Sequence, residues 1–549
     1  MRKPFVLTKW IAILTLVISV TLSMFVLYAP KPVNKAEHFS SERALTYIKV
    51  ISQEPHSVFD AEAHEKVRLY IKDTLTDLLG EAHVSEYNFP VSRFKTETGE
   101  IRNLLGVIPG KSETGIMLVG HYDSVATSYG AADDGYALGA MLEIADLYKN
   151  QELENSIYFL FTDAEETGLD GAYEMEKENE LMSKVGFVIN IEARGVRGAA
   201  YMFETSSNNK KVIDFYRQAQ FPVSYSLATA IYQVMPNDTD FTHFRSIGKN
   251  GVNFAVIEGI EHYHTLLDNY GELSPSSLQH YGEQIVPMVD AFVKNEKYSD
   301  VNYFDATEDS VFFTLFPNVF VNYTETVTHI LNVAVLILLI AVTIVMLRKH
   351  LGHSKKLIRQ LFLFFGSFLL SVILALGFAL LTAKLGKVPY YPTYVIVNGS
   401  GWATLLFFSA ICIATFAIYA RIADSLNKQR TFLFFGIFLQ LSLAIITGIL
   451  LPGMSFLFFV PELLGTLALA ASMKKNPIAK HVTYGLTTLI SILLIIPILY
   501  TFFLSLTVGS APILVVLLLI HLTVLIPVFR LHLQIGEDTS VNESTVSPT

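Results

Sequence analysis

The sequence of 549 residues is poor in cysteine and in charge. Its single cysteine, Cys412, lies in an apolar run, so one chain can form neither a disulfide framework nor a cysteine zinc site. Charged residues make up only 16% of the chain and the formal net charge is −10, which excludes the basic surface typical of nucleic-acid binding. Any metal bound here must therefore use histidine and carboxylate ligands.

Apolar residues are in excess. They account for 51% of the chain, and the mean hydropathy is +0.42, too apolar for a single soluble enzyme. The excess lies in roughly the first 30 residues and beyond about residue 327, whereas residues 31–305 have the mixed composition of a globular domain. We therefore expect a lipid bilayer to be one partner of the chain, and residues 31–305 to form one large core.

The N-terminus predicts a membrane anchor. Three basic residues precede the apolar stretch 10–29, which is long enough to span a bilayer. A cleaved signal peptide is the alternative, but cleavage after Ala29 would place the bulky Leu27 where a small residue is normally required. We expect an uncleaved anchor, with residues 1–9 in the cytoplasm.

The C-terminal part predicts a transmembrane domain of about seven helices over residues 327–530, between a juxtamembrane linker at 306–326 and a polar tail at 531–549. The apolar stretches are 327–347, 360–384, 401–420, 431–451, 454–473, 482–507 and 511–529. Basic residues gather in the first, third and fifth connections, which places those connections in the cytoplasm. Glu462 and His521 lie within the apolar stretches, where we expect them to be packed and hydrogen-bonded between helices.

Both topology signals place the middle domain outside the cytoplasm. The lack of disulfides and the short connections suit a bacterial cell membrane with an extracellular domain. A vacuolar or other endomembrane with a lumenal domain is the alternative.

The middle domain is predicted to have an α/β fold. Short apolar runs at 116–120, 157–162, 187–191 and 252–257 are typical of buried strands. Between the first two, Leu138, Leu142, Ala145 and Leu147 form a helical stripe. Sites in such folds form at the carboxyl ends of the strands.

Polar motifs follow each of these runs. After the first comes His121, with Asp123 placed to accept a hydrogen bond from its ring, and then a small-residue turn containing Asp133 and Asp134. Each feature alone has an ordinary explanation, because two acids at the start of a helix are commonly a cap.

The later runs end in further acids and a histidine. Glu165 and Glu166 follow the second run, where one carboxylate could bind a metal and the other could take a proton from water. Glu192 ends the third run and His264 follows the fourth. A solvated acidic loop would explain the glutamate pair alone, but the whole set, each member after a different strand, predicts a metal site.

At these residues the sequence resembles the M28 family of zinc aminopeptidases, and most of all its membrane-associated branch of fungal vacuolar membrane proteases and bacterial relatives. The resemblance covers roughly residues 40–295 and rests on His-Tyr-Asp-Ser, Ala-Asp-Asp-Gly, Glu-Glu-x-Gly, Glu-Ala-Arg-Gly and Tyr-His-Thr. The stretch 236–241 also resembles that branch. The resemblance implies a zinc-exopeptidase-like mixed sheet with helices on both faces.

The resemblance also implies two zinc ions per chain. His121, Asp133 and Glu192 would bind one ion, and Asp133, Glu166 and His264 the other, so that Asp133 bridges the pair. Glu165 would be the general base, and Asp123 would orient His121. Some members carry Asp where Glu192 stands, which leaves the coordination mode of that residue open.

Other residues are candidates for substrate binding: Arg194, Tyr232, Asp240, His243 and Tyr263. Ordinary alternatives exist, because Arg194 could pair with a carboxylate and Asp240 could cap a turn. For His262 we expect a structural role.

The resemblance implies a membrane-bound exopeptidase, an aminopeptidase acting on peptides. A carboxypeptidase or dipeptidase could use the same two zinc ions, and a glutaminyl cyclase would use one. The remaining alternative is a receptor or transporter whose external domain has lost catalysis.

Overall fold

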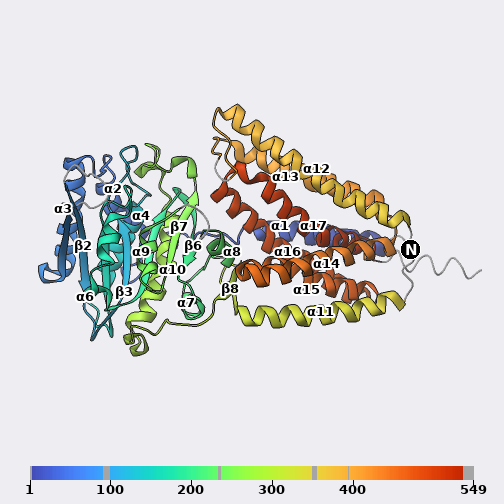
Figure 1. The fold of residues 1–549 in the computed structure, drawn as a ribbon, viewed down its shortest axis with the longest axis horizontal. Helices are drawn as coiled ribbons and strands as arrows, with labels where there is room; N and C mark the ends of the chain where they lie inside the picture. The colour runs from blue at the N-terminus through green and yellow to red at the C-terminus, as the bar shows by residue number, and fades with distance from the viewer. Residues whose placement is uncertain (1–2, 91–98, 233–236, 349–354, 393–394, 536–549) are drawn as a thin grey trace, which may run out of the picture. The chain divides into compact units, whose positions relative to one another are not determined.

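The computed structural model describes residues 3–90, 99–232, 237–348, 355–392 and 395–535 (Figure 1). Residue 236 of the stretch 236–241 and residues 536–549 of the predicted tail lie outside the described residues. The chain divides into two compact units, Leu27–Thr324 and a second unit made of Met1–Val26 and Glu325–Thr549.

The first unit is built on a seven-stranded mixed sheet with the strand order β1-β2-β4-β3-β5-β7-β6. The strands are β1 (Val84–Pro90), β2 (Glu100–Ile108), β3 (Ser112–His121), β4 (Asn155–Thr162), β5 (Val185–Ala193), β6 (Arg197–Thr205) and β7 (Gly251–Glu258). The four central strands, β4, β3, β5 and β7, are parallel, whereas the outer strands pair antiparallel. The central four correspond to the four predicted apolar runs, so the α/β prediction is confirmed.

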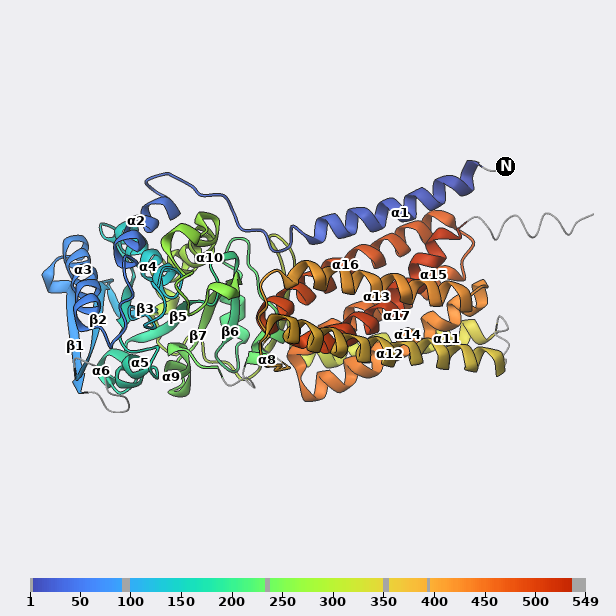
Figure 2. The ribbon, with the colours of Figure 1, turned by 90° about the horizontal axis from the view of Figure 1, so that it is seen from above.

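Both faces of the sheet are covered, which explains why the central strands are continuously apolar. On β3, Ile116 and Leu118 enter one core, and the alternate residues Met117 and Val119 enter another. Helices lie on the two sides as Figure 2 shows: α2 (Ser41–Ile51), α3 (Ala61–Leu79), α4 (Gly135–Tyr148) and α10 (Pro275–Val293) on one, and α5 (Asp170–Met175), α6 (Asn179–Met182) and α9 (Asp240–Ser246) on the other. Helices packed on both faces thus support the sheet edge where the parallel strands end.

The remaining elements of this unit are short. They are η1 (Glu81–His83), α7 (Lys210–Tyr216), α8 (Ser226–Tyr232), η2 (Ile260–His262), η3 (Tyr270–Glu272), η4 (Glu296–Ser299) and the hairpin β8 (Ser310–Phe316) with β9 (Val319–Thr324). The hairpin occupies the segment 306–326 that was predicted to be a linker. Phe312 is fully buried in the main core, so this segment is part of the folded unit and not a simple connection.

The second unit contains only helices among its described residues. They are α1 (Lys3–Ser23), α11 (Glu325–Arg348), α12 (Lys355–Gly386), α13 (Ser400–Ile422), α14 (Leu426–Leu450), η5 (Pro452–Met454), α15 (Phe456–Ser472), α16 (Pro477–Leu506), η6 (Val508–Ser510) and α17 (Ala511–Leu533). Within the described part, six of them are long and apolar enough to cross a bilayer: α11, α12, α13, α14, α16 and α17. The apolar part of α1, Leu7–Ser23, and α15 are shorter.

The two ionisable residues singled out in the apolar stretches, Glu462 and His521, are buried among these helices. Both ring nitrogens of His521 contact carbonyl oxygens, Nδ1 that of Leu517 at 2.8 Å and Nε2 that of Leu457 at 2.9 Å. Pro461 lacks the N–H that would bond the Leu457 carbonyl within α15, so His521 takes a structural role there. Glu462 is packed as expected, but neither of its carboxylate oxygens has a hydrogen-bond partner within the described part of the chain.

Candidate metal centre

Five elements bring the predicted metal ligands to one edge of the sheet. His121 is the last residue of β3, and Glu192 lies next to the last residue of β5. Glu166 follows β4, Asp133 precedes α4, and His264 lies in the loop after β7. Because parallel strands end at the same edge, these side chains meet although they are far apart in sequence.

Asp133 contacts both histidines, one with each carboxylate oxygen. Its Oδ1 lies 3.4 Å from His121 Nε2, and its Oδ2 lies 3.2 Å from His264 Nε2. A carboxylate that presents one oxygen to each of two imidazoles is suited to bridging two cations. This contact pattern supports the choice of Asp133 as the bridging acid.

Each histidine also meets a second acid. Glu192 Oε2 lies 3.8 Å from His121 Nε2, and Glu166 Oε2 lies 3.2 Å from His264 Nε2. The five predicted ligands therefore form two groups that share Asp133.

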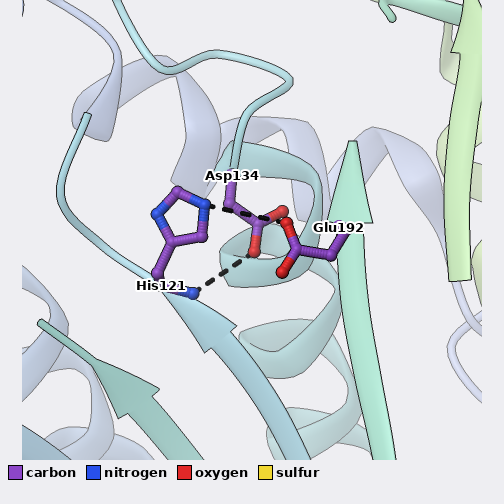
Figure 3. Close-up of side chains that lie close together, drawn as sticks. All are labelled: His121, Asp134 and Glu192. Carbon is purple, nitrogen blue, oxygen red and sulfur yellow. Dashed lines mark hydrogen bonds and ion pairs between the residues drawn. The ribbon is translucent and has the colours of Figure 1, made fainter. Parts of the chain in front are cut away.

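Asp134 also belongs to this cluster, which the sequence analysis did not assign. Its Oδ2 accepts a hydrogen bond of 3.3 Å from the backbone N–H of His121, as Figure 3 shows beside Glu192. Among the described residues, three groups have ligand atoms that all lie within 4.8 Å of one another and could hold a metal ion. They are His121 with Asp134 and Glu192, His121 with Glu165 and Glu166, and Asp133 with Glu166 and His264. Asp134 is thus an alternative ligand beside His121, whereas Asp133 alone of the two acids joins the group of His264.

The donor atoms fit a bound cation. Asp134 Oδ1 and Glu166 Oε1 are buried and make no hydrogen bond within the described residues. Leaving such atoms unpaired costs about 1–3 kcal/mol each, and a cation would satisfy them. Imidazole nitrogens and carboxylate oxygens in these numbers match the ligands of zinc.

The pKa values of these side chains also indicate that the cluster of acids lacks a compensating positive charge. Burial, with the charge of Asp133 adding to it, raises the pKa of Glu192 to about 8 and that of Glu166 to about 7. Burial would also raise the pKa of Asp133, but the two imidazoles hold it at about 2. Burial lowers the pKa of His264, yet Asp133 and Glu166 outweigh this effect and raise it to about 10. A divalent cation would replace the protons that these groups otherwise hold.

Asp123 has two roles, of which the sequence analysis recognised one. Its carboxylate lies 3.5 Å from His121 Nδ1, although that nitrogen is closer, at 2.9 Å, to the main-chain oxygen of Asp123. The same carboxylate accepts hydrogen bonds from the N–H groups of Glu165 at 3.0 Å and Glu166 at 3.2 Å. Asp123 therefore fixes both the imidazole and the turn that carries the two glutamates.

Glu165 lies beside the metal ligands. One of its oxygens is within 4.8 Å of donor atoms of His121 and Glu166. Burial, reinforced by the charges of Glu192 and Glu166, raises the pKa of Glu165 well above its usual value. A carboxyl group in this place can exchange a proton with a water molecule held between the ligands.

Two further acids support the site. Asp268 accepts hydrogen bonds from the N–H groups of Ala132 at 2.7 Å and Asp133 at 3.2 Å, and from the Ser128 hydroxyl at 3.2 Å. Asp163, between β4 and Glu165, contacts Nε2 of His64 at 2.8 Å. The sequence analysis singled out neither residue. The only signal was their closeness in sequence to His264 and Glu165.

The candidate substrate residues differ in their environments. The ring of Tyr263 stacks on that of His264 at a centroid distance of 3.7 Å, and the Arg194 guanidinium lies 5.9 Å from the Tyr263 ring. Asp240 is buried at the start of α9, where Oδ2 accepts a hydrogen bond from Thr162 and Oδ1 has no partner among the described residues. These three candidates lie close to the ligands or to the end of β4.

The other candidates contact residues outside the proposed ligand set. The ring of Tyr232 packs edge-on against Phe203 at 4.8 Å, and burial raises the pKa of its hydroxyl, with the charges of Glu204 and Glu192 adding to the effect. His243 pairs with Glu176 at 3.0 Å. Nδ1 of His262 lies 3.1 Å from the main-chain oxygen of Gly259, consistent with a structural role.

The chain is similar to several known proteins. It is 26% identical over 308 residues to a vacuolar membrane protease of Candida dubliniensis, covering 52% of this chain and 32% of that protein. It is 32% identical over 175 residues to the human endoplasmic reticulum metallopeptidase 1, covering 31% of this chain and 19% of that protein. The chain thus spans less than half of the length of these curated relatives. The six described helices that are long and apolar enough to cross a bilayer support a multi-pass membrane protein.

Similar solved structures include a Bacillus subtilis zinc aminopeptidase, 15% identical, with a TM-score of 0.38 over 49% of this chain and 99% of that one. A glutaminyl cyclase from Porphyromonas gingivalis is 20% identical, with a TM-score of 0.39 over 46% of this chain and 99% of that one. At these values neither structure identifies an activity. The family model of peptidase family M28 matches residues 103–289, which include all five predicted ligands. Residues 103–289 of the chain are therefore similar to peptidase family M28.

Proposed function

We propose that this protein is a membrane-bound, two-zinc exopeptidase that removes residues from the N-terminus of peptides. The observation that carries the proposal is Asp133, whose two carboxylate oxygens face His121 and His264 at 3.4 and 3.2 Å. This arrangement supports two zinc sites that share one acid. The match of residues 103–289 to the model of peptidase family M28, and relatives named as a protease and a metallopeptidase, support hydrolysis of peptides.

The residues divide the work between binding and proton transfer. His121, Asp133 and Glu192 would hold one zinc ion, and Asp133, Glu166 and His264 the other. When bound, zinc lowers the pKa of water towards neutrality and polarises a carbonyl group. Glu165 takes a proton from the attacking water and returns it to the leaving amine, and Asp123 keeps the backbone of Glu165 in place.

The charge of the site favours the amino end of a peptide over its carboxyl end. Bound zinc ions would lower the pKa values of the surrounding carboxyl groups, so that Asp134, Asp240 and Glu165 would add negative charge to that of the three proposed carboxylate ligands. An α-ammonium group is attracted by such an excess, whereas a terminal carboxylate is repelled. Arg194, beside Tyr263, is suited to the carbonyl oxygen of the scissile bond.

The test uses the purified full-length protein and three versions of one peptide: unmodified, N-acetylated and C-amidated. We expect hydrolysis of the unmodified and amidated peptides, loss of activity with a chelator and two zinc ions per chain. Cleavage that requires a free carboxyl end would replace the aminopeptidase with a carboxypeptidase. One zinc ion with cyclisation of N-terminal glutamine would indicate a glutaminyl cyclase, and a zinc-free, inert protein would exclude an enzyme.

We also propose that the catalytic unit faces away from the cytoplasm, at a bacterial cell membrane or in an endomembrane lumen. The charge asymmetry of the connections supports this orientation. A cysteine introduced at Lys35, in a Cys412→Ser background, should react with a membrane-impermeant maleimide in intact cells if the unit is extracellular. Protection in intact cells and reaction only after lysis would place it in a lumen or in the cytoplasm, which protease protection of isolated vesicles separates.

A further inference from the structure

A row of buried polar side chains crosses three neighbouring strands beneath the metal centre. Asn190 on β5 is paired in register with Asn253 on β7, and Asn253 is paired with Glu204 on β6. A register shift between Met202 and Glu204 marks an irregularity in β6 at this point. All three polar side chains are fully buried, in a sheet whose central strands are otherwise apolar. Polar groups in such a place are retained only if hydrogen bonds satisfy them.

The amide groups connect this row to Glu192. Asn190 Nδ2 donates to Glu192 Oε1 at 3.1 Å and to Asn253 Oδ1 at 3.1 Å. Asn253 Nδ2 in turn donates to Glu204 Oε2 at 3.1 Å and to Thr239 Oγ1 at 2.8 Å. Both hydrogens of each amide nitrogen are used, so neither amide group can turn without losing bonds.

These bonds determine which oxygen of Glu192 is available. Oε1 is occupied by Asn190, whereas Oε2 is the atom that lies 3.8 Å from His121 Nε2. A glutamate has one more rotatable bond than an aspartate, and the bond from Asn190 removes that freedom. The side chain is thereby held with a single oxygen directed at the proposed ligand group.

We infer that Asn190 and Asn253 are positioning residues that make Glu192 a one-oxygen ligand and connect it to the start of α9. Asn253 holds Asn190 from behind, and its bond to Thr239 reaches the residue that precedes Asp240. Glu204, at the far end of the row, lies 3.5 Å from the guanidinium of Arg245 on α9. One network thus sets both a metal ligand and a candidate substrate residue. This inference rests on the proposed two-zinc site.

The test measures zinc affinity in the purified full-length protein by chelator competition, together with kcat/KM. Loss of a residue that orients a metal ligand typically lowers metal affinity by about 10- to 100-fold. We expect Asn190→Ala to weaken the binding of one of the two zinc ions by about this factor and to leave the binding of the other unchanged. Asn253→Ala should cause a smaller loss of affinity. The matched control is Asn155→Ala. Asn155 is an equally buried asparagine at the first residue of β4, and it bonds the main-chain oxygens of Phe292 and Asn295.

A merely structural role would lower the stability of Asn190→Ala and Asn155→Ala alike without changing zinc affinity in either folded protein. That result would overturn the inference. A double-mutant cycle with Glu192→Asp gives a second readout, because the shorter acid cannot keep both the Asn190 bond and the ligand position. Asn190→Ala should then cost much less zinc affinity in the Glu192→Asp background. Full additivity would contradict the inference.

Asn190→Asp keeps the side-chain volume if Asn190→Ala fails to fold. It replaces the donating amide with a carboxylate that repels Glu192, so zinc affinity should fall at least as far as expected for alanine. Failure of the proposed two-zinc site is distinguishable, because the wild-type protein itself would then bind fewer than two zinc ions. Wild-type zinc affinity in a folded Asn190→Asp protein would overturn the inference alone.

Discussion

Replacing Asp268 with asparagine should disable the site without removing any proposed ligand. The carboxylate of Asp268 accepts three hydrogen bonds, from the N–H groups of Ala132 and Asp133 and from the hydroxyl of Ser128. Asparagine has one accepting oxygen and one donating nitrogen. Whichever way its amide turns, a donor then faces one of the two N–H groups.

The expected magnitude follows from this geometry. A hydrogen bond to a charged group contributes about 1.5–3 kcal/mol, and the unpaired N–H that remains is buried. Because each 1.4 kcal/mol corresponds to a factor of about ten, the turn that carries Asp133 should leave its productive position about 10- to 100-fold more often. Since Asp133 faces both histidines, the affinity for both zinc ions should fall together.

Chelator competition and kcat/KM measured on the same preparation would test this prediction. The control is Asp290→Asn, because Asp290 accepts a hydrogen bond from Tyr148 at 2.9 Å on helices that carry no ligand. A folded Asp268→Asn protein with wild-type zinc affinity and turnover would refute the reasoning. Loss of only one zinc ion would indicate that Asp133 does not bridge the two sites.

Three other outcomes are expected. Glu165→Gln should keep both zinc ions and lose about 10²- to 10⁴-fold in kcat, the usual contribution of general acid–base catalysis; near-normal turnover would remove Glu165 from that role. Asp133→Ala should abolish binding of both zinc ions, whereas Asp134→Ala should spare the zinc ion at His264. Zinc titration of the two variants would show this difference. If both variants lost the same zinc ion, both acids would be assigned to that ion. Burial lowers the pKa of His280 from its ordinary value of 6.5 to about 4, so below pH 6.5 the unfolded chain takes up a proton that the folded chain excludes. The free energy of unfolding is therefore unaffected by protonation of His280 above pH 6.5, and it falls by about 3 kcal/mol as the pH drops to 4. The protection factors of the β6 amides, which correct for the intrinsic exchange rate at each pH, should therefore fall over that range in wild type, and less in His280→Gln.

The sequence predicted the centre of the sheet better than its edges. The four parallel strands are buried on both faces, so each appears as an uninterrupted apolar run such as residues 157–162. The antiparallel strands β1 and β6 are mixed in character: β1 alternates exposed and partly buried residues, and β6 contains register shifts near Ala200 and Glu204. In irregular edge strands of this kind, apolar and polar residues do not alternate regularly enough in the sequence to predict a strand.

The candidate site shows a similar division. The closeness of His121, Glu166 and Glu192 could be expected from the sequence because each comes at or soon after the end of an apolar run. Asn190 could not be singled out in this way, because it lies inside such a run and would normally be taken as a weak point in a strand. Its importance depends on the register that pairs it with Asn253, and pairing between strands far apart in sequence leaves no local signal.

Asp123 shows how sequence spacing can identify a residue while assigning it only part of its role. Its position two residues after His121 predicted a bond to the imidazole, but its carboxylate lies closer to the N–H of Glu165, at 3.0 Å, than to His121 Nδ1, at 3.5 Å. Glu165 is 42 residues away in sequence and reaches Asp123 only because β3 and β4 are parallel neighbours that end together. The sheet topology thus turns a residue expected to orient one ligand into a support shared by that ligand and the proposed general base.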